Sequence, residues 1–244
     1  MEREAPLPRI EPRHFVAELE GAGPVEVAEV RLTGIPRGAV ALLCGGDGLA
    51  TQAPEVMNAL AEHGYETLAV DLGSGSLARA DAVAAVRSLL ALLGERGWGA
   101  EQVGVVGYGA GGTAAFAAAG ALSLGAAISL SPRDVLAEPV ALTSTPWLGM
   151  FGEHDEHTTP ESVVELGRRL ADAPCFSRVV IYPGVGADYF RGAADALGHA
   201  AAFDSWQRLV EWLNARVSPR LSPYAELWEL RRDPSDPSPE GSVR

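Results

Sequence analysis

The sequence lacks lysine entirely. All 19 of its basic residues are arginine, and 32 acidic residues give the 244-residue chain a net charge of −13. Without lysine there is no Schiff base, no pyridoxal-phosphate attachment and no phosphate-loop lysine. The shortage of positive charge also argues against nucleic acid or an anionic membrane as a partner, because both need a basic surface.

Cysteines and long apolar runs are also scarce. The only cysteines are Cys44 and Cys175, and two cysteines far apart in a chain of this size do not make a disulfide framework. Charged and polar residues interrupt every apolar run before it reaches membrane-spanning length. Residues 1–13 are charged and rich in proline, unlike a secretory signal. We therefore predict a cytoplasmic protein.

Short apolar runs alternate with segments of helical spacing along most of the chain. The predicted strands are 25–33, 38–44, 66–70, 102–106, 126–130, 147–151 and 178–182, and the predicted helices are 52–63, 77–93, an alanine-rich segment after Gly112, 161–171 and 201–217. Buried strands separated by helices are typical of a parallel sheet with both faces covered. The fold class that follows is α/β, a three-layer, doubly wound, mostly parallel sheet.

The predicted domain of this class covers residues 25–217. Residues 1–24 are predicted to be an N-terminal arm, 218–232 a C-terminal helix and 233–244 a disordered tail.

Ligands of doubly wound sheets bind beyond the carboxyl ends of the strands. The loops expected at that edge are 44–49, 108–112, 131–134, 152–158 and 184–190.

A glycine-rich turn follows the strand at 102–106 and supports two interpretations. Gly107, Gly109 and Gly112 match the dinucleotide fingerprint G-x-G-x-x-G. That fingerprint normally opens the first βαβ unit, whereas here several strands precede it, and the next strand ends without the acid that would hold a ribose. The alternative is a nucleophile elbow, G-x-Nuc-x-G, flanked by Gly107 and Gly111. We favour the elbow, which places Gly109 at the nucleophile position.

Several segments, in the same order along the chain, resemble dienelactone hydrolases, a branch of the α/β-hydrolase fold. The family turn Gly-Tyr-Cys-x-Gly-Gly corresponds to residues 107–112, Phe-Gly-Glu-x-Asp to 151–155, Tyr-Pro-Gly-x-Gly-His-x-Phe to 182–190, and His-Glu-x-x-Gly-Leu to 44–49. The resemblance covers about residues 25–217 and implies the α/β-hydrolase fold.

The same resemblance implies that the hydrolytic machinery is incomplete. The family's nucleophile corresponds to Gly109, its histidine to Ala187, and the glutamate that interacts with its nucleophile to Gly45, whereas the triad acid is retained as Asp155. Covalent acyl transfer needs a nucleophile and a base within hydrogen-bond reach. A triad carboxylate only orients and stabilises the histidine, so Asp155 alone does not restore this chemistry. The Ala110 N–H could still form an oxyanion hole.

Other residues near these loops are candidates for binding or residual chemistry. The predicted ligand-binding residues are Cys44, Gly45, Asp47, Tyr108, Ala110, Ser131, His154 and Asp188. Cys44 and Ser131 are also alternative nucleophiles, although a buried apolar cysteine and a hydrogen-bonding serine are the simpler interpretations. Asp47, Asp155 and Asp188 are candidate acid or base groups in one pocket. His154 and His157 bracket Asp155, but their loop spacing is not diagnostic of a metal site.

Three hypotheses follow. The first is a small-molecule-binding protein that has lost triad hydrolysis, with an organic acid, lactone or ester-like molecule as its ligand. The second is a non-hydrolytic enzyme for proton transfer, elimination or cyclisation through pocket carboxylates. The third is an ester or lactone hydrolase with a displaced nucleophile. None of them requires a cofactor or metal, and a homodimer through a sheet edge or the last helix stays open.

Overall fold

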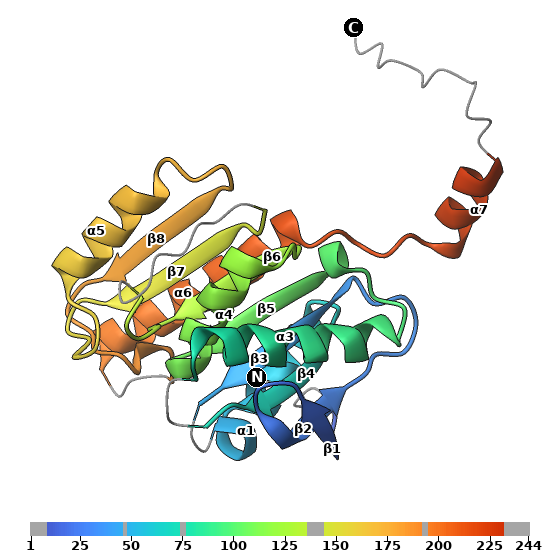
Figure 1. The fold of residues 1–244 in the computed structure, drawn as a ribbon, viewed down its shortest axis with the longest axis horizontal. Helices are drawn as coiled ribbons and strands as arrows, with labels where there is room; N and C mark the ends of the chain where they lie inside the picture. The colour runs from blue at the N-terminus through green and yellow to red at the C-terminus, as the bar shows by residue number, and fades with distance from the viewer. Residues whose placement is uncertain (1–8, 46–47, 74–76, 136–143, 192–194, 232–244) are drawn as a thin grey trace, which may run out of the picture.

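The structure is a computed structural model that describes residues 9–45, 48–73, 77–135, 144–191 and 195–231. A single sheet of eight strands runs through the molecule, with helices in front of it and behind it (Figure 1). The predicted α/β class, with a mostly parallel sheet in three layers, is therefore confirmed.

The strands follow the spatial order β1-β2-β4-β3-β5-β6-β7-β8. Their bounds are β1 Arg13–Leu19, β2 Gly23–Val30, β3 Gly38–Cys44, β4 Tyr65–Asp71, β5 Val103–Tyr108, β6 Ala126–Leu130, β7 Trp147–Gly152 and β8 Ser177–Tyr182. Strands β3 to β8 pair in parallel, while β2 joins β1 and β4 in antiparallel fashion. Every residue of β3, β5, β6 and β7 is buried, as expected for strands covered on both faces.

Five helices cover the two faces of the sheet. The helices α2 (Ala53–Glu62) and α6 (Ala196–Arg216) pack on one face, and α3 (Arg79–Gly94), α4 (Ala110–Ala121) and α5 (Pro160–Leu170) pack on the other. The short elements are α1 (Gly48–Thr51), η1 (Ala100–Gln102), η2 (Tyr189–Arg191) and α7 (Pro223–Arg231). Because β3 to β8 run parallel, their carboxyl ends lie at one edge of the sheet.

Several elements differ from the sequence prediction. The strand β1 lies in the stretch predicted as an N-terminal arm, and it pairs with β2 along its whole length. The sheet therefore begins before residue 25. The helix α6 begins at Ala196 rather than at 201, because the Asp195 carboxylate caps it by accepting the Gly198 N–H at 2.7 Å. The short helix α1 was not predicted.

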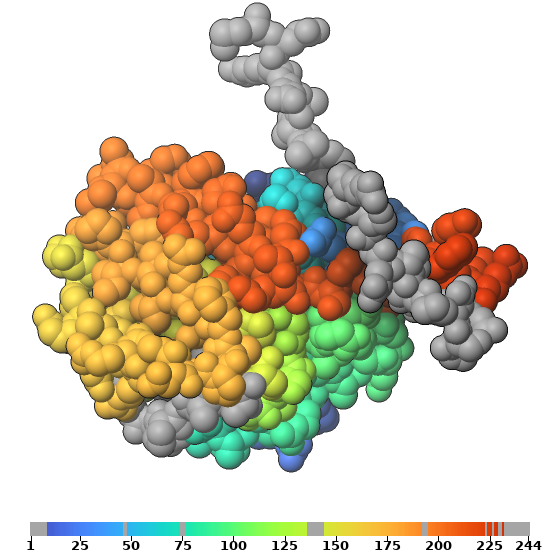
Figure 2. Space-filling model, turned by 90° about the horizontal axis from the view of Figure 1, so that it is seen from above, coloured from blue at the N-terminus to red at the C-terminus, as the bar shows by residue number. Residues whose placement is uncertain are grey.

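The C-terminal helix predicted within 218–232 is present as α7, and the predicted tail at 233–244 lies outside the described residues. In Figures 1 and 2 the α7 helix projects from the body of the molecule, with Tyr224, Leu227 and Trp228 largely exposed. Within the described part of the chain, no helix combines the length and the apolar character needed to cross a bilayer.

Candidate functional site

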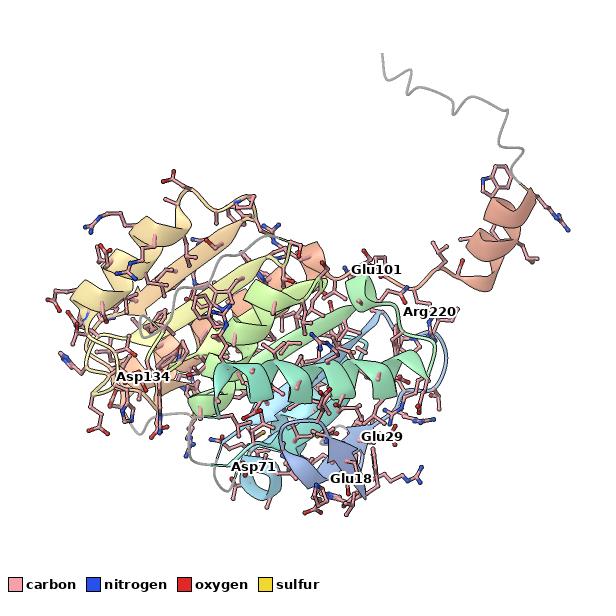
Figure 3. All side chains as sticks on the ribbon, viewed as in Figure 1. Glu18, Glu29, Asp71, Glu101, Asp134 and Arg220 are labelled. Carbon is pink, nitrogen blue, oxygen red and sulfur yellow. The ribbon has the colours of Figure 1, made fainter. Side chains whose placement is uncertain are left out.

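The candidate site lies at the carboxyl edge of the parallel strands. Figure 3 labels Asp71, the last residue of β4, and Asp134, which follows β6, toward this end of the molecule; Glu101, which precedes β5, lies at the opposite end. This is the edge at which the sequence predicted a ligand site.

A sharp turn joins β5 to α4 at this edge. Gly109 has φ 55° and ψ −118°, and α4 begins at the next residue. A Cβ atom on Gly107 would stand 2.0 Å from the Gly111 carbonyl oxygen, and one on Gly111 would stand 2.1 Å from the Leu43 carbonyl oxygen. Larger residues would therefore collide with backbone at both flanks, which is the physical reason for the glycine spacing of this turn. The Gly109 N–H also donates to the Leu130 carbonyl at 2.9 Å.

A pocket of about 290 Å³ opens above this turn. The predicted site residues that line it are Gly45, Tyr108, Gly109, Ala110, Ser131, Ala187 and Asp188. It is also lined by residues that the sequence analysis did not single out: Gly48, Thr51, Gln52, Arg133, Phe190 and Arg191. The loops after β3, β5, β6 and β8 thus meet at this pocket, and Gly109 and Ala187 border it together.

Other predicted residues do not line this pocket. Cys44 is buried and His154 is exposed, and neither belongs to the lining. The backbone N–H of His154 donates to the Val185 carbonyl. Asp47 lies outside the described residues. The expected group of three pocket carboxylates is therefore not assembled by the described residues, since Asp155 does not line the pocket either.

Asp155 is buried behind the pocket wall, with 5% of its surface exposed. Its Oδ1 atom accepts the His157 N–H at 2.9 Å, whereas its Oδ2 atom is buried without a hydrogen-bond partner. Burial raises the pKa of Asp155, and the His157 N–H, the neighbouring Ser131 hydroxyl and the Arg133 charge offset only part of that rise. The retained acid is thus a carboxyl group held where its charged form is disfavoured.

Ser131 connects Asp155 to the pocket. It is 3% exposed and has φ 42°, a left-handed conformation that non-glycine residues seldom adopt. Its side chain lies near the Asp155 carboxylate. The Ser131 Oγ atom nevertheless forms no well-formed hydrogen bond with a described residue. Ser129, by contrast, is used structurally, because its hydroxyl donates to the Gly112 carbonyl and accepts from Trp147.

Aromatic rings form an apolar side of the pocket. The rings of Tyr108 and Phe190 lie 4.7 Å apart, and Tyr189 packs against Tyr182 with 4.9 Å between ring centres. The Tyr189 hydroxyl is buried without a hydrogen-bond partner, and burial raises the pKa of Tyr189 well above its ordinary value. Of these rings, Tyr108 and Phe190 line the pocket and offer a ligand dispersion contacts, while Tyr182 and Tyr189 pack behind them outside the lining.

Two arginines give the pocket its positive charge. Arg191 forms an ion pair with Asp188 at 3.2 Å, and both side chains are substantially exposed. Arg133 is half-buried, and its Nε atom lies 4.0 Å from the point where a Cβ atom on Gly109 would stand. Sequence reasoning missed both residues; the only signal for Arg133 was its position two residues after Ser131 in a loop at the ligand edge.

The structure also bears on two other chemistries, a cysteine nucleophile and a metal site. Burial raises the pKa of the Cys44 thiol to about 12, so this cysteine carries almost no thiolate at neutral pH. His154 and His157 are exposed. Among the residues that the structure describes, no group of three or more histidine, cysteine or acidic side chains is arranged to hold a metal ion.

The chain and its fold match known proteins. The family model of the dienelactone hydrolase family matches residues 76–217. A solved structure from Klebsiella pneumoniae, provisionally described as a dienelactone hydrolase, superposes with a TM-score of 0.72 at 18% identity, covering 84% of this chain and 99% of that one. A puromycin-hydrolysing peptidase from Mycobacterium tuberculosis superposes with a TM-score of 0.64 at 15% identity, covering 85% of this chain and 40% of that one.

Curated relatives match a shorter segment. A protein of Salmonella typhimurium, provisionally named a carboxymethylenebutenolidase, is 32% identical over 69 residues, which are 28% of this chain and 26% of that protein. An Escherichia coli protein with the same provisional name is 30% identical over equal spans. The match thus covers about a quarter of the length of these relatives, and the structural likenesses, all at low identity, show the fold.

Proposed function

Because this chain belongs to the dienelactone hydrolase family, we propose that it keeps the family's pocket as a binding site for a small organic molecule and has lost hydrolysis through a covalent intermediate. The observation that carries the proposal is the pairing of Gly109 and Ala187. Both line the same pocket, at the positions that correspond to the family nucleophile and histidine.

Neither residue can supply the chemical group that acyl transfer needs at its position. Glycine offers no nucleophile, and a methyl group cannot accept a proton, so the two steps of acyl transfer lack both reactants. Two of the other candidates, Cys44 and Ser129, do not replace them. Cys44 is buried with its pKa raised to about 12, and the Ser129 hydroxyl bridges Gly112 and Trp147.

The pocket itself remains suited to a small ligand. Its volume of about 290 Å³, its aromatic side and its arginines combine apolar contact with a few polar groups, the composition typical of small-molecule sites. An organic acid, lactone or ester-like molecule fits this description.

One experiment tests the proposal directly. The protein is incubated with an activated ester and, separately, with serine-directed and thiol-directed covalent probes, and its intact mass is measured beside the rate of ester cleavage. We expect no saturable turnover and no labelled pocket residue. Turnover that accompanies stoichiometric labelling of a pocket residue would overturn the proposal.

A restored variant tests the assignment of the two positions. The double variant Gly109→Cys with Ala187→His supplies a nucleophile and a base, and we expect it to acquire ester cleavage. Gly109→Cys alone is the matched control, because it has the nucleophile without the histidine. Equal cleavage by the single and double variants would contradict the pairing of these positions.

A second candidate function rests on Ser131. This residue lines the pocket in a left-handed conformation and lies near Asp155, whose raised pKa suits a proton acceptor. A hydrolase with Ser131 as a displaced nucleophile would attack the ester carbonyl through Oγ while Asp155 takes its proton. The same mass measurement distinguishes this candidate, because the serine-directed probe would then label Ser131 and the Ser131→Ala variant would lose both label and turnover.

A further inference from the structure

The first turn of α4 faces the pocket without a side-chain cap. Gly109 stands at the N-cap position and has no side chain with which to accept the helix N–H groups. The first N–H groups of a helix lack acceptors within the helix, and the helix dipole gives this end a partial positive charge. The helix has twelve residues, so the dipole is well developed.

Arg133 adds a full positive charge at the same place. Thr113, in the first turn of α4, holds the Arg133 backbone at two points: its hydroxyl accepts the Arg133 N–H at 2.8 Å and donates to the Arg133 carbonyl at 2.8 Å. The guanidinium Nε then lies 4.0 Å from where a Cβ on Gly109 would stand. Among the described residues, this guanidinium forms no hydrogen bond or close ion pair, and its charge acts on the carboxyl group of Asp155, whose pKa it lowers.

Ser131 supplies an independent sign of a missing ligand atom. Its hydroxyl is buried, it lines the pocket, and within the described structure it makes no well-formed hydrogen bond, although it lies beside the Asp155 carboxyl group and lowers the pKa of that group. Buried polar groups nearly always have a partner, so an oxygen atom from a bound molecule would complete its hydrogen bonding.

The described carboxylates near Gly109 do not neutralise the positive charge of Arg133 and the α4 terminus. Asp188 is already paired with Arg191 at 3.2 Å. Asp155 lies behind Ser131 rather than in the pocket, and burial already disfavours its charged form. Among the described residues that line the pocket, no carboxylate pairs with Arg133, whose charge also acts on the buried Asp155.

We propose that the pocket binds the carboxylate of a small organic acid at the place where a side chain on Gly109 would stand, between Arg133, Ser131 and the first turn of α4. The proposal rests on the proposed function, because a nucleophile side chain at position 109 would fill the same space. Charge-assisted bonds from a guanidinium and a helix terminus suit a carboxylate, and the rings of Tyr108 and Phe190 contact the rest of the molecule.

A pair of isosteric variants tests the anion site without any ligand. Gly109→Asp and Gly109→Asn strain the backbone alike, and both residues are equally good N-caps, so they differ only in charge. We expect the aspartate variant to melt about 2–4 °C higher than the asparagine variant. In an Arg133→Gln background that advantage should shrink. An aspartate variant that melts at or below the asparagine variant would overturn the proposal.

Ligand binding is tested with acids and their neutral amides. Acetate, butyrate, benzoate and phenylacetate are each compared with the corresponding amide by calorimetry. We expect at least one acid to bind at least about tenfold more tightly than its amide, and Arg133→Gln to remove this preference. Arg87→Gln, which removes an exposed arginine on α3, is the control that keeps it. If no acid binds better than its amide, the proposal is wrong.

The two proposals can fail separately. Turnover with a labelled pocket residue would contradict the proposed loss of hydrolysis, regardless of how the acids bind. If the protein shows no turnover and binds acids and amides equally well, only the proposed carboxylate site is contradicted.

Discussion

The Nε atom of Arg133 is the one described heavy atom that comes within 4.0 Å of the position a Cβ atom would take on Gly109. Position 109 therefore has room for a side chain, unlike its neighbours Gly107 and Gly111, where a Cβ would collide with backbone. The cost of adding a side chain at 109 is set by the backbone conformation and by Arg133, rather than by packing.

This relationship predicts the effect of Gly109→Cys on stability. At φ 55°, a non-glycine residue is strained by about 1–3 kcal/mol, and no clash adds to that cost. We expect a lower free energy of unfolding, measured by urea denaturation. Gly94→Cys is the control, since Gly94 is exposed at the end of α3, has room for a Cβ and lacks a positive φ. An unchanged or higher stability for Gly109→Cys would argue against the strained turn.

The Asp155→Asn variant should change how stability depends on pH. Burial raises the pKa of Asp155 above its ordinary value of 3.8, so the folded protein binds this proton more tightly than the unfolded chain does. The wild type therefore loses stability as pH rises from about this ordinary value through the raised folded pKa. Asparagine cannot ionise and keeps an oxygen for the His157 N–H.

We expect Asp155→Asn to be more stable than wild type at neutral pH, and this gain to shrink as the pH falls toward the ordinary carboxyl pKa. Urea unfolding over a pH series measures it. Asp172→Asn, which removes an exposed carboxylate, controls for the change in net charge. A gain that stays constant across the series would show that Asp155 titrates as an ordinary surface acid.

Ser129→Ala should destabilise the elbow region. The Ser129 hydroxyl donates to the Gly112 carbonyl at 2.7 Å and accepts from Trp147 Nε1 at 2.9 Å, all in the buried core. Alanine leaves the indole N–H unpaired, which costs about 1–3 kcal/mol. Thermal unfolding should show a larger loss than Ser205→Ala, where a buried serine donates only to the Ala202 carbonyl. Similar losses in the two variants would contradict the bridging role.

Thiol labelling should distinguish the two cysteines. Cys44 is 3% exposed with its pKa raised to about 12, whereas Cys175 is only partly buried. We expect iodoacetamide to add one group to the native protein, at Cys175. The Cys175→Ser variant should then stay unmodified until it is unfolded. Rapid modification of Cys44 in the native state would reopen its role as a displaced nucleophile.

Much of the fold could be predicted because buried strands appear in the sequence as continuous apolar runs. The strand at 38–44 was predicted with its exact bounds, since seven consecutive apolar residues are buried on both faces of the sheet. Strand β1 was missed because it lies at the sheet edge, where its partly exposed residues Arg13, His14 and Glu18 break the apolar pattern. The start of α6 was missed because Asp195 sets it through a local cap rather than through periodicity.

The part of the site that could be predicted is the turn, because its backbone geometry allows only glycine at certain positions. Clashes at Gly107 and Gly111 explain why the turn could be recognised from glycine spacing. Arg133 could not be anticipated, because its position depends on Thr113 of a different element. Asp155 was predicted beside the pocket, yet its burial behind Ser131 depends on how two loops pack, which no single segment encodes.

The distribution of steric constraint around the turn has a consequence for design. The flanking positions are fixed by collisions with the backbone, while the central position is limited only by its torsion angle. A Cβ atom at residue 109 thus meets no steric clash in the scaffold. A library of side chains at this one position could be screened for new reactivity without rebuilding the surrounding strands and helices.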